Sequence, residues 1–299
     1  MKKIILCVDT GIDDFITLLV AGTQKEKFNI VGVCASYGNC DLQNATQNTI
    51  KALNLVGCDD VQVYQGSNEP LNGIKMRDAT DVHGNNGLGD IEYKVITKTI
   101  PSERAEDFLI RKINENKGEI TLIVTSPLTD VAKAIKKDEG FIGKLENLVI
   151  MGGGIKEGNI TEYAEFNFYQ DPEATSIVFE NAQKKIIMIG LDVANKNVID
   201  MKMMDFVSNI HTEKGAFIHK LFDKLEESIL YDPLTICYLI EHSILKLKDA
   251  DVKIIKSGIQ AGRTVLNKES TNYNCMFAYD INVDKSREIL LNNLFPNEF

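Results

Sequence analysis

Short apolar runs alternate with helical patterns along most of this chain, and no other feature of the sequence restricts the fold as strongly. Runs with the length and residue types of buried strands occur at residues 4–8, 30–36, 61–64, 120–125, 148–151 and 186–191. Helical patterns lie between most of these runs. Alternation of this kind predicts an α/β fold with a mainly parallel, open, Rossmann-like central sheet flanked by helices.

The helices can be placed by their periodicity and their terminal residues. They are expected at residues 12–22, with Gly22 as the C-cap, and at 42–56, 102–116, 127–137, 172–181, 201–210, 214–229, 233–241 and 285–294. Apolar alternation at residues 252–268 and 275–284 predicts additional strands. Because no repeat or flexible linker divides the chain, residues 1–299 are expected to form a single domain.

Charge and cysteine content disfavour several classes of function. A net charge of -10 disfavours binding to nucleic-acid phosphates. The six cysteines include no CxxC pair, so we expect buried thiols rather than a zinc site. No apolar run is long enough to span a bilayer, and the first residues do not resemble a signal peptide. We therefore expect a cytoplasmic protein that acts on a small molecule and binds no membrane.

The stretch "CVDTGIDD" places Asp9, Asp13 and Asp14 directly after the first predicted strand. Polar and glycine residues also follow other strands, in "YGN", "TSPLTD" and "MGGG". Ligands of open α/β sheets bind at the carboxyl ends of the strands, so these segments are expected to form one site. Clustered carboxylates and carbonyls suit Ca²⁺ better than Mg²⁺, which keeps most of its water ligands.

Three other roles for the acidic turn account for the sequence less well. Asp13 and Asp14 could simply occupy the first helical turn, where acidic side chains favour the helix dipole, but this does not account for Asp9. A phosphoryl-transfer enzyme with an aspartate nucleophile would need a second aspartate at the position of Cys7. A dinucleotide-binding loop would need two further glycines in "GIDDF".

Read together, these segments resemble the inosine-uridine preferring nucleoside hydrolase family, whose first strand ends in a DxDxGxDD motif. The resemblance extends over nearly the whole chain, in the same order as in the family. The matching segments beyond the acidic turn are "ASYGN" (35–39), "HGNNGLG" (83–89), "TSPLTDVA" (125–132), "VIMGGGIKEGNIT" (149–161), "AEFNFYQDPEA" (164–174) and "YDPLTICY" (231–238). The resemblance implies an enzyme that hydrolyses the N-glycosidic bond of ribonucleosides to ribose and free base, in nucleoside salvage.

The resemblance also implies roles for individual residues. Calcium would be bound by Asp9, Asp14, Asp232 and the backbone carbonyl of Thr125. Asp9 would in addition be the general base that activates a calcium-held water. The residues that would bind the ribose hydroxyls or line the sugar pocket are Asp13, Asn39, Met151, Asn159, Glu165 and Asn167. Family members form dimers or tetramers, so a homodimer or homotetramer is expected.

Several of these residues also have a simpler structural interpretation. Glu165 and Asn167 are expected to point to the same side, because they lie two apart in a segment that we predict to be extended. Asp232 precedes a proline and could be only a helix cap. His83 lies in a glycine-rich loop that could close over a ligand, or it could be a solvated loop histidine.

The sequence departs from the family pattern at two positions. Family members have a histidine that protonates the leaving base directly before the last aspartate, and here Tyr231 occupies that position. A phenol is a weaker acid than imidazolium at neutral pH, although it can donate a hydrogen bond. Cys7 replaces the first aspartate of the motif. The chain has no tryptophan, so the candidates for stacking on the base are Phe166, Tyr169, Tyr231 and Tyr238.

Two other functions remain as alternatives. The protein could be a nucleoside-binding or ribose-binding protein that has lost leaving-group chemistry at Tyr231. A Mg²⁺-dependent phosphohydrolase on the same α/β plan would instead release phosphate. Neither alternative accounts for the ordered segments "NIT", "EFN" and "YDP" as well as the hydrolase does.

Overall fold

A computed structural model describes residues 1–74, 78–225, 229–296 and 298. Its central feature is an eight-stranded sheet with the order β3-β2-β1-β4-β5-β6-β10-β7. All neighbouring strands are parallel except β10 and β7, so the prediction of a mainly parallel sheet is confirmed. The strands are β1 (Lys2–Val8), β2 (Phe28–Ala35), β3 (Val63–Gln65), β4 (Ile120–Val124), β5 (Asn147–Met151), β6 (Ile186–Ile189), β7 (Leu245–Ala250) and β10 (Cys275–Ile281).

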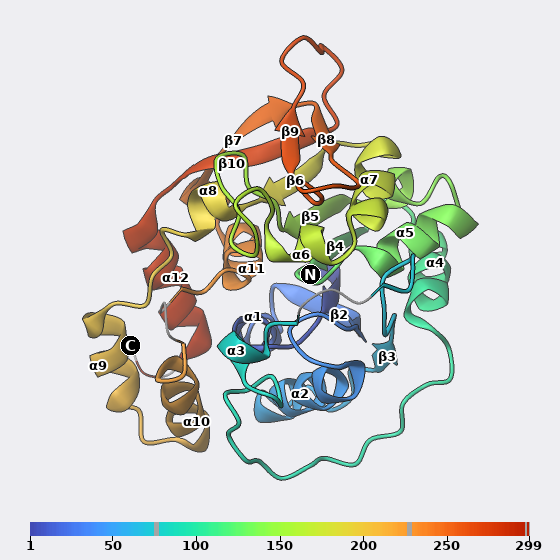
Figure 1. The fold of residues 1–299 in the computed structure, drawn as a ribbon. Helices are drawn as coiled ribbons and strands as arrows, with labels where there is room; N and C mark the ends of the chain where they lie inside the picture. Colours follow the sequence, from blue (N-terminus) through green and yellow to red (C-terminus); the bar gives the residue numbers. More distant parts are fainter. Residues whose placement is uncertain (75–77, 226–228, 297, 299) are drawn as a thin grey trace.

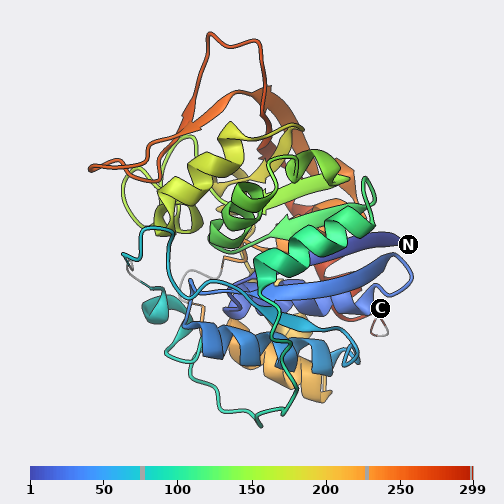
Figure 2. The same ribbon diagram turned by 90° about the vertical axis from the view of Figure 1, so that its right-hand side faces the viewer.

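Helices cover both faces of the sheet (Figure 1). One face carries α1 (Ile12–Thr23), α2 (Leu42–Leu55), α8 (Leu191–Ala194), α9 (Met201–Ser208), α10 (Glu213–Phe222), α11 (Pro233–Ile240) and α12 (Val283–Leu294). The other face carries α4 (Ala105–Glu115), α5 (Thr129–Lys137) and α7 (Pro172–Glu180), which Figure 2 shows on the near side of the sheet. Each face has its own apolar core, as expected for a sheet whose central strands are buried on both sides.

The shorter elements lie at the ends and edges of this sandwich. They are α3 (Thr80–His83), α6 (Phe166–Gln170), two 3₁₀ turns at Ile142–Lys144 and His242–Ile244, and a separate antiparallel pair, β8 (Val252–Ile254) and β9 (Thr264–Leu266). The segment 91–104, which has neither helix nor strand, runs around the outside of α2 before α4 begins (Figure 1). No helix among the described residues has the length and apolar character needed to cross a bilayer.

The structure differs from the sequence-based expectations mainly after residue 210. The predicted helix at 214–229 ends at Phe222, and residues 226–228 of that prediction lie outside the described residues. Strand β7 was not predicted, because half of the residues in its sequence "LKLKDA" are charged, as is common at a sheet edge where charged side chains discourage further pairing. The first helix ends at Thr23 with Gln24, rather than Gly22, as its C-cap.

The sheet order places a natural binding site at the ends of β1 and β4. The chain winds outward from β1 to β2 and β3 on one side, and from β4 to β5 and β6 on the other. The loops that follow β1 and β4 therefore turn in opposite directions and leave a crevice between them. All six cysteines are free and buried, which confirms the expectation of core thiols.

Candidate active site

A cavity of about 330 Å³ opens at this crevice. The segments that line it follow the carboxyl ends of several strands or begin helices, as the sheet order predicts. Its lining residues are Asp13, Asn39, Asp78, Ala79, Asp81, Val82, His83, Thr125, Met151, Asn159, Ile160, Glu165, Phe166, Asn167, Leu225, Ile229, Tyr231 and Asp232. The volume lies at the lower end of the range for small-molecule sites, so the cavity can hold a ligand about the size of a nucleoside.

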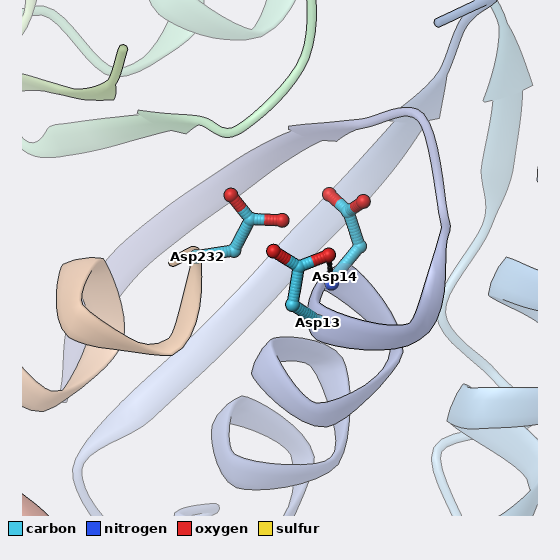
Figure 3. Close-up of side chains that lie close together, drawn as sticks. All are labelled: Asp13, Asp14 and Asp232. Carbon is cyan, nitrogen blue, oxygen red and sulfur yellow. Dashed lines mark hydrogen bonds between the residues drawn. The ribbon is translucent and has the colours of Figure 1, made fainter. Parts of the chain in front are cut away.

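Three buried carboxylates meet at the cavity, which Asp13 and Asp232 line and behind whose surface Asp14 lies. Asp13 and Asp14 lie on the first turn of α1, and Asp232 directly precedes α11 (Figure 3). One oxygen from each of the three lies within 4.8 Å of the others. These are hard oxygen donors, and their number and spacing suit a divalent cation such as Ca²⁺. The three residues could therefore hold a metal ion.

Asp9 lies behind this cluster, at the end of β1. Its Oδ2 accepts a hydrogen bond of 2.8 Å from the backbone N–H of Asn39. Its Oδ1 is buried and has no hydrogen-bond partner within the described part of the chain. Gly38 lies so close that a Cβ atom there would be 1.8 Å from Asp9 Oδ2, which accounts for the glycine in the "YGN" segment. The loop after β2 thus fixes one oxygen of Asp9 and leaves the other available.

Asp14 is held by hydrogen bonds on both of its oxygens. Oδ1 accepts from the Thr125 hydroxyl at 2.6 Å, and Oδ2 accepts from the Asn39 side chain and from the backbone N–H of Gly11. The bond from Gly11 is the half of a capping box that a carboxylate at the third helical position supplies, so Asp14 also stabilises the start of α1, as the capping interpretation expects. Asn39 consequently contacts both Asp9 and Asp14, and it fixes their relative positions.

Burial and mutual repulsion shift the ionisation of these carboxylates. Burial, followed by the charge of Asp13, raises the pKa of Asp14 to about 7. Burial raises the pKa of Asp9 and of Asp232 well above the ordinary value, and neighbouring aspartates add to both shifts. Burying several like charges is costly without a compensating positive charge. A bound cation would supply this charge and favour the ionised forms.

One side of the cavity is formed by α6 and by Glu165 directly before it. The helix begins at Phe166, so Asn167 is helical, and the prediction of an extended segment holds only for the backbone of Glu165. Glu165 is the N-cap of α6, and its carboxylate accepts hydrogen bonds from the backbone N–H groups of Gly153, Asn167 and Phe168. Both Glu165 and Asn167 nevertheless line the cavity. A glutamate can cap a helix of this kind only when its carboxylate folds back, which spacing alone does not reveal.

Hydrogen bonds also fix the amides of this side. The Asn167 side chain donates to the backbone carbonyls of Thr125, at 3.0 Å, and Met151, at 3.3 Å. The Thr125 carbonyl, which the family resemblance assigns to calcium, therefore lies at the cavity with one hydrogen bond already made. The side-chain Oδ1 of Asn159 accepts a hydrogen bond from the backbone N–H of Phe166. Burial raises the pKa of Glu165 to about 7, against the opposing effect of its three N–H donors.

His83 and Tyr231 also line the cavity, as does Phe166, the first residue of α6. His83 is buried at the end of α3, with an exposed fraction of 7 %, so the alternative of a solvated loop histidine is wrong. Its Nδ1 accepts a hydrogen bond from the backbone N–H of Ile12, which leaves the proton of the neutral ring on Nε2. Burial lowers the pKa of His83. A neutral imidazole and a phenol thus both line the cavity.

The structure brings most of the predicted site residues into one cavity. Asp9 and Asp14 do not line the cavity and lie behind its surface. The three carboxylates that lie within 4.8 Å of one another include Asp13, whereas the family resemblance implies Asp9 as a calcium ligand. Asp232 makes no capping hydrogen bond with its side chain, so the interpretation as a simple helix cap is wrong. Sequence reasoning missed the lining residues Asp78, Ala79, Asp81, Val82, Ile160, Leu225 and Ile229. The first four directly precede His83, and extending the predicted loop toward the N-terminus would have included them.

Cys7 does not contribute to the cavity. It pairs with Cys34 across β1 and β2, and both thiols lie in the apolar core beneath α4 and α5. Their neighbours in that core include Ile5 and Val124. The departure from the family motif therefore places an uncharged group in an apolar environment, where it does not perturb the cavity surface.

The fold and the site define an α/β protein with an acidic, oxygen-lined cavity at the topological switch point, suited to a hard cation and a polyol such as a sugar. Comparison with known proteins agrees. The profile described as "Inosine-uridine preferring nucleoside hydrolase" matches residues 4–288. The chain therefore belongs to this family and is a nucleoside hydrolase, a glycosidase.

Individual relatives cover most of the chain. "Uridine nucleosidase 1" from Arabidopsis thaliana is 31% identical over 284 residues, which are 91% of this chain and 84% of the relative. "Inosine-uridine preferring nucleoside hydrolase" from Crithidia fasciculata is 31% identical over 277 residues, 88% of this chain and 87% of that protein. The solved structure of a plant nucleoside hydrolase superimposes with a TM-score of 0.92 at 27% identity and covers 98% of both chains.

Proposed function

We propose that this protein is a calcium-dependent hydrolase that cleaves the N-glycosidic bond of ribonucleosides to give ribose and the free base. The observation that carries the proposal is the buried Asp9 Oδ1, which lacks a hydrogen-bond partner within the described ranges and lies beside the acidic cluster. A buried polar atom without a partner is costly, and a cation or an attacking water would provide one. The all-oxygen donor set fits Ca²⁺.

Asp9 is proposed as the general base. The hydrogen bond from Asn39 fixes Oδ2, so Oδ1 is the oxygen that accepts a proton from the attacking water. Burial raises the pKa of Asp9, which brings its basicity closer to that needed near neutral pH. Ca²⁺, when bound, would lower the pKa of a water and orient the ribose hydroxyls. Thr125 and Asp232, together with Asp14, are proposed to hold the ion.

The sugar-binding residues are proposed to stabilise charge as well as to position the ribose. Cleavage of the N-glycosidic bond generates an oxocarbenium-like sugar with developing positive charge. Carboxylates of Asp13 and Glu165 and the amides of Asn159 and Asn167 lie around the cavity. Because backbone N–H groups already orient Glu165, its negative charge is preorganised and needs no rearrangement during the reaction.

The leaving base is proposed to receive hydrogen bonds from Tyr231 and His83. Neither hydrogen bond requires a charged side chain, since the phenol of Tyr231 and the neutral imidazole of His83 each carry one donor proton. The curated relative from Arabidopsis thaliana is named for uridine, so uridine is the first substrate to test. A uracil leaving group has carbonyl oxygens that can accept both hydrogen bonds.

For Tyr231→Phe we expect kcat for uridine to fall about tenfold, the effect of losing one hydrogen bond to the leaving group, about 1.4 kcal/mol. A 4-nitrophenyl riboside, whose leaving group needs no activation, should be cleaved at nearly the wild-type rate. The matched control is Tyr279→Phe, at an exposed tyrosine of β10. Equal losses with both substrates would mean that Tyr231 acts on the sugar or on folding rather than on the base.

The proposed function is tested by incubating the protein with uridine, inosine, cytidine, adenosine and 2′-deoxyuridine. We expect reducing sugar from at least one ribonucleoside, loss of this activity with a calcium chelator, and recovery when Ca²⁺ is returned. The deoxynucleoside should react more slowly, because one oxygen proposed to bind the ion is missing. No sugar from any nucleoside would refute the hydrolase proposal.

The remaining functions give different results in the same experiment. Tight binding of a nucleoside without turnover would identify a binding protein with an incomplete catalytic set. Mg²⁺-dependent release of phosphate from nucleotides would identify a phosphohydrolase. Activity that persists in chelator would remove Ca²⁺ from the proposal and leave the hydrolase class intact.

A further inference from the structure

Asn48 lies in the middle of α2, outside the cavity, and its side chain joins three separate segments. It is completely buried, with an exposed fraction of 0 %. Its Nδ2 donates to the backbone carbonyl of Thr10 at 2.9 Å and to that of Asn86 at 2.8 Å. Its Oδ1 accepts a hydrogen bond from the Tyr93 hydroxyl. All of the strong hydrogen-bonding groups of this amide are therefore in use apart from one lone pair.

The chemistry of the partners fixes the orientation of the amide. Carbonyl oxygens of Thr10 and Asn86 can only accept, so the NH₂ group must face both of them. The side-chain oxygen of Asn48 then accepts a hydrogen bond from the hydroxyl of Tyr93, which can donate. A side chain without two donor protons at this position would leave the buried carbonyl of Thr10 and the partly buried carbonyl of Asn86 without these partners.

The two carbonyls belong to the two halves of the active site. Thr10 lies between Asp9 and the first turn of α1, and its hydroxyl is also within 2.7 Å of the Thr49 hydroxyl, the next residue of α2. Asn86 belongs to the glycine-rich loop that follows His83. The contact is close, because a Cβ atom at Gly87 would be 2.8 Å from the Asn48 amide nitrogen. Asn48 thus links the aspartate turn to the histidine loop.

A direct bond joins the same two segments inside the cavity. The backbone N–H of Ile12 donates to His83 Nδ1 at 3.2 Å. The geometry of this bond depends on the distance between the aspartate turn and the loop, and the Asn48 amide bridges that distance from behind. Movement at Asn48 would therefore alter both the carboxylate cluster and the direction of the imidazole.

We infer that Asn48 is a positioning residue, which holds the aspartate turn of residues 9–14 in register with the loop of residues 83–90. The inference rests on the proposed function, because the proposed function assigns metal binding to the aspartate turn and contact with the leaving base to the loop of residues 83–90. Residues that orient ligands from behind commonly affect metal affinity or activity by about 10–100-fold.

The test compares Asn48→Leu with Asn54→Leu, the same substitution at an exposed position of the same helix. We expect Asn48→Leu to weaken Ca²⁺ binding about tenfold by titration calorimetry and to lower kcat for uridine by a similar factor at saturating Ca²⁺. Asn54→Leu should change neither quantity. Partial unfolding would lower the number of Ca²⁺ ions bound per chain but would leave the Kd of the folded molecules unchanged, so it can be told apart.

Tyr93→Phe provides a milder variant in case Asn48→Leu does not fold. It removes the donor to Asn48 Oδ1 and keeps both donations from Nδ2, so we expect a change of about threefold in the same direction. Hydrogen exchange adds a measurement that needs neither metal nor substrate. Amides of residues 11–14 and 84–89 should both exchange faster in Asn48→Leu, and neither should change in Asn54→Leu.

The failure of this inference differs from the failure of the proposed function. A wild-type protein that releases no sugar refutes the proposed function, while the exchange comparison still tests Asn48. Unchanged Ca²⁺ affinity together with unchanged exchange at residues 11–14 in a folded Asn48→Leu protein would overturn the positioning role. Faster exchange in residues 84–89 alone would also overturn it, because Asn48 would then hold only the loop.

Discussion

Asp9→Asn is expected to lower kcat for the preferred ribonucleoside at least about a hundredfold, the scale typical of removing a general base. Asparagine has nearly the same shape, and its carbonyl oxygen can still accept the hydrogen bond from Asn39 that holds Oδ2. The change therefore removes the basic oxygen and the charge with little disturbance of the β1 end. The measurement is kcat at saturating substrate and saturating Ca²⁺.

Two comparisons isolate the role of Asp9 in this experiment. The 4-nitrophenyl riboside should lose as much rate as uridine, because attack by water is impaired whichever group leaves. Asp60→Asn, at an exposed aspartate that does not line the cavity, should behave as the wild type. A kcat within a few-fold of wild type at saturating Ca²⁺ would refute the assignment of Asp9 as the base.

The fold could be predicted from the sequence because its central strands are short, apolar and separated by strongly patterned helices. The run Ile4–Val8 is buried on both faces, so its hydrophobicity alone identifies it. The edge strand β7 lacks this signal, because alternate lysines point to solvent and its partner β10 is distant in sequence. Its pairing depends on tertiary contact rather than on local pattern.

The site was predictable where chemistry and strand ends coincide. Asp13, Asp14 and Asp232 could be associated through the family resemblance, but only the structure places them within 4.8 Å of one another. Sequence spacing could not show that Asn39 bridges two aspartates, since its contacts are with residues far along the chain. The same applies to Glu165, whose backbone is extended as expected, but whose role as the N-cap of α6 depends on hydrogen bonds from three backbone N–H groups.

Removing one charge from the acidic cluster is expected to raise the thermal stability of the metal-free protein and to lower its affinity for Ca²⁺. In the absence of metal, Asp13, Asp14 and Asp232 are buried like charges, and burial and their mutual repulsion raise the pKa of Asp14 and Asp232. Asp232→Asn removes one of these charges. The metal-free protein should therefore have a higher thermal midpoint when it is measured at a pH above neutral, where the carboxylates are charged. Because a ligand charge is lost, Ca²⁺ should bind at least about tenfold more weakly.

The readout is the increase in thermal midpoint on adding Ca²⁺, with and without the substitution. A ligand stabilises the folded state in proportion to the logarithm of its concentration over Kd, so a tenfold weaker Kd removes about 1.4 kcal/mol of this stabilisation. Loss of a helix cap does not complicate the result, since the Asp232 side chain makes no capping hydrogen bond to α11. Uridine hydrolysis by Asp232→Asn should require correspondingly more Ca²⁺.

Asp171→Asn is the matched control, because Asp171 is also a buried aspartate that directly precedes a proline and a helix. Its carboxylate accepts hydrogen bonds from Ala174, Leu71 and Thr129, so it has the structural role that Asp232 lacks. We expect this variant to lower the metal-free thermal midpoint and to keep the full Ca²⁺-induced increase. If Asp232→Asn behaved in the same way as Asp171→Asn, then Asp232 would be a structural residue and the cation would have to be held without it.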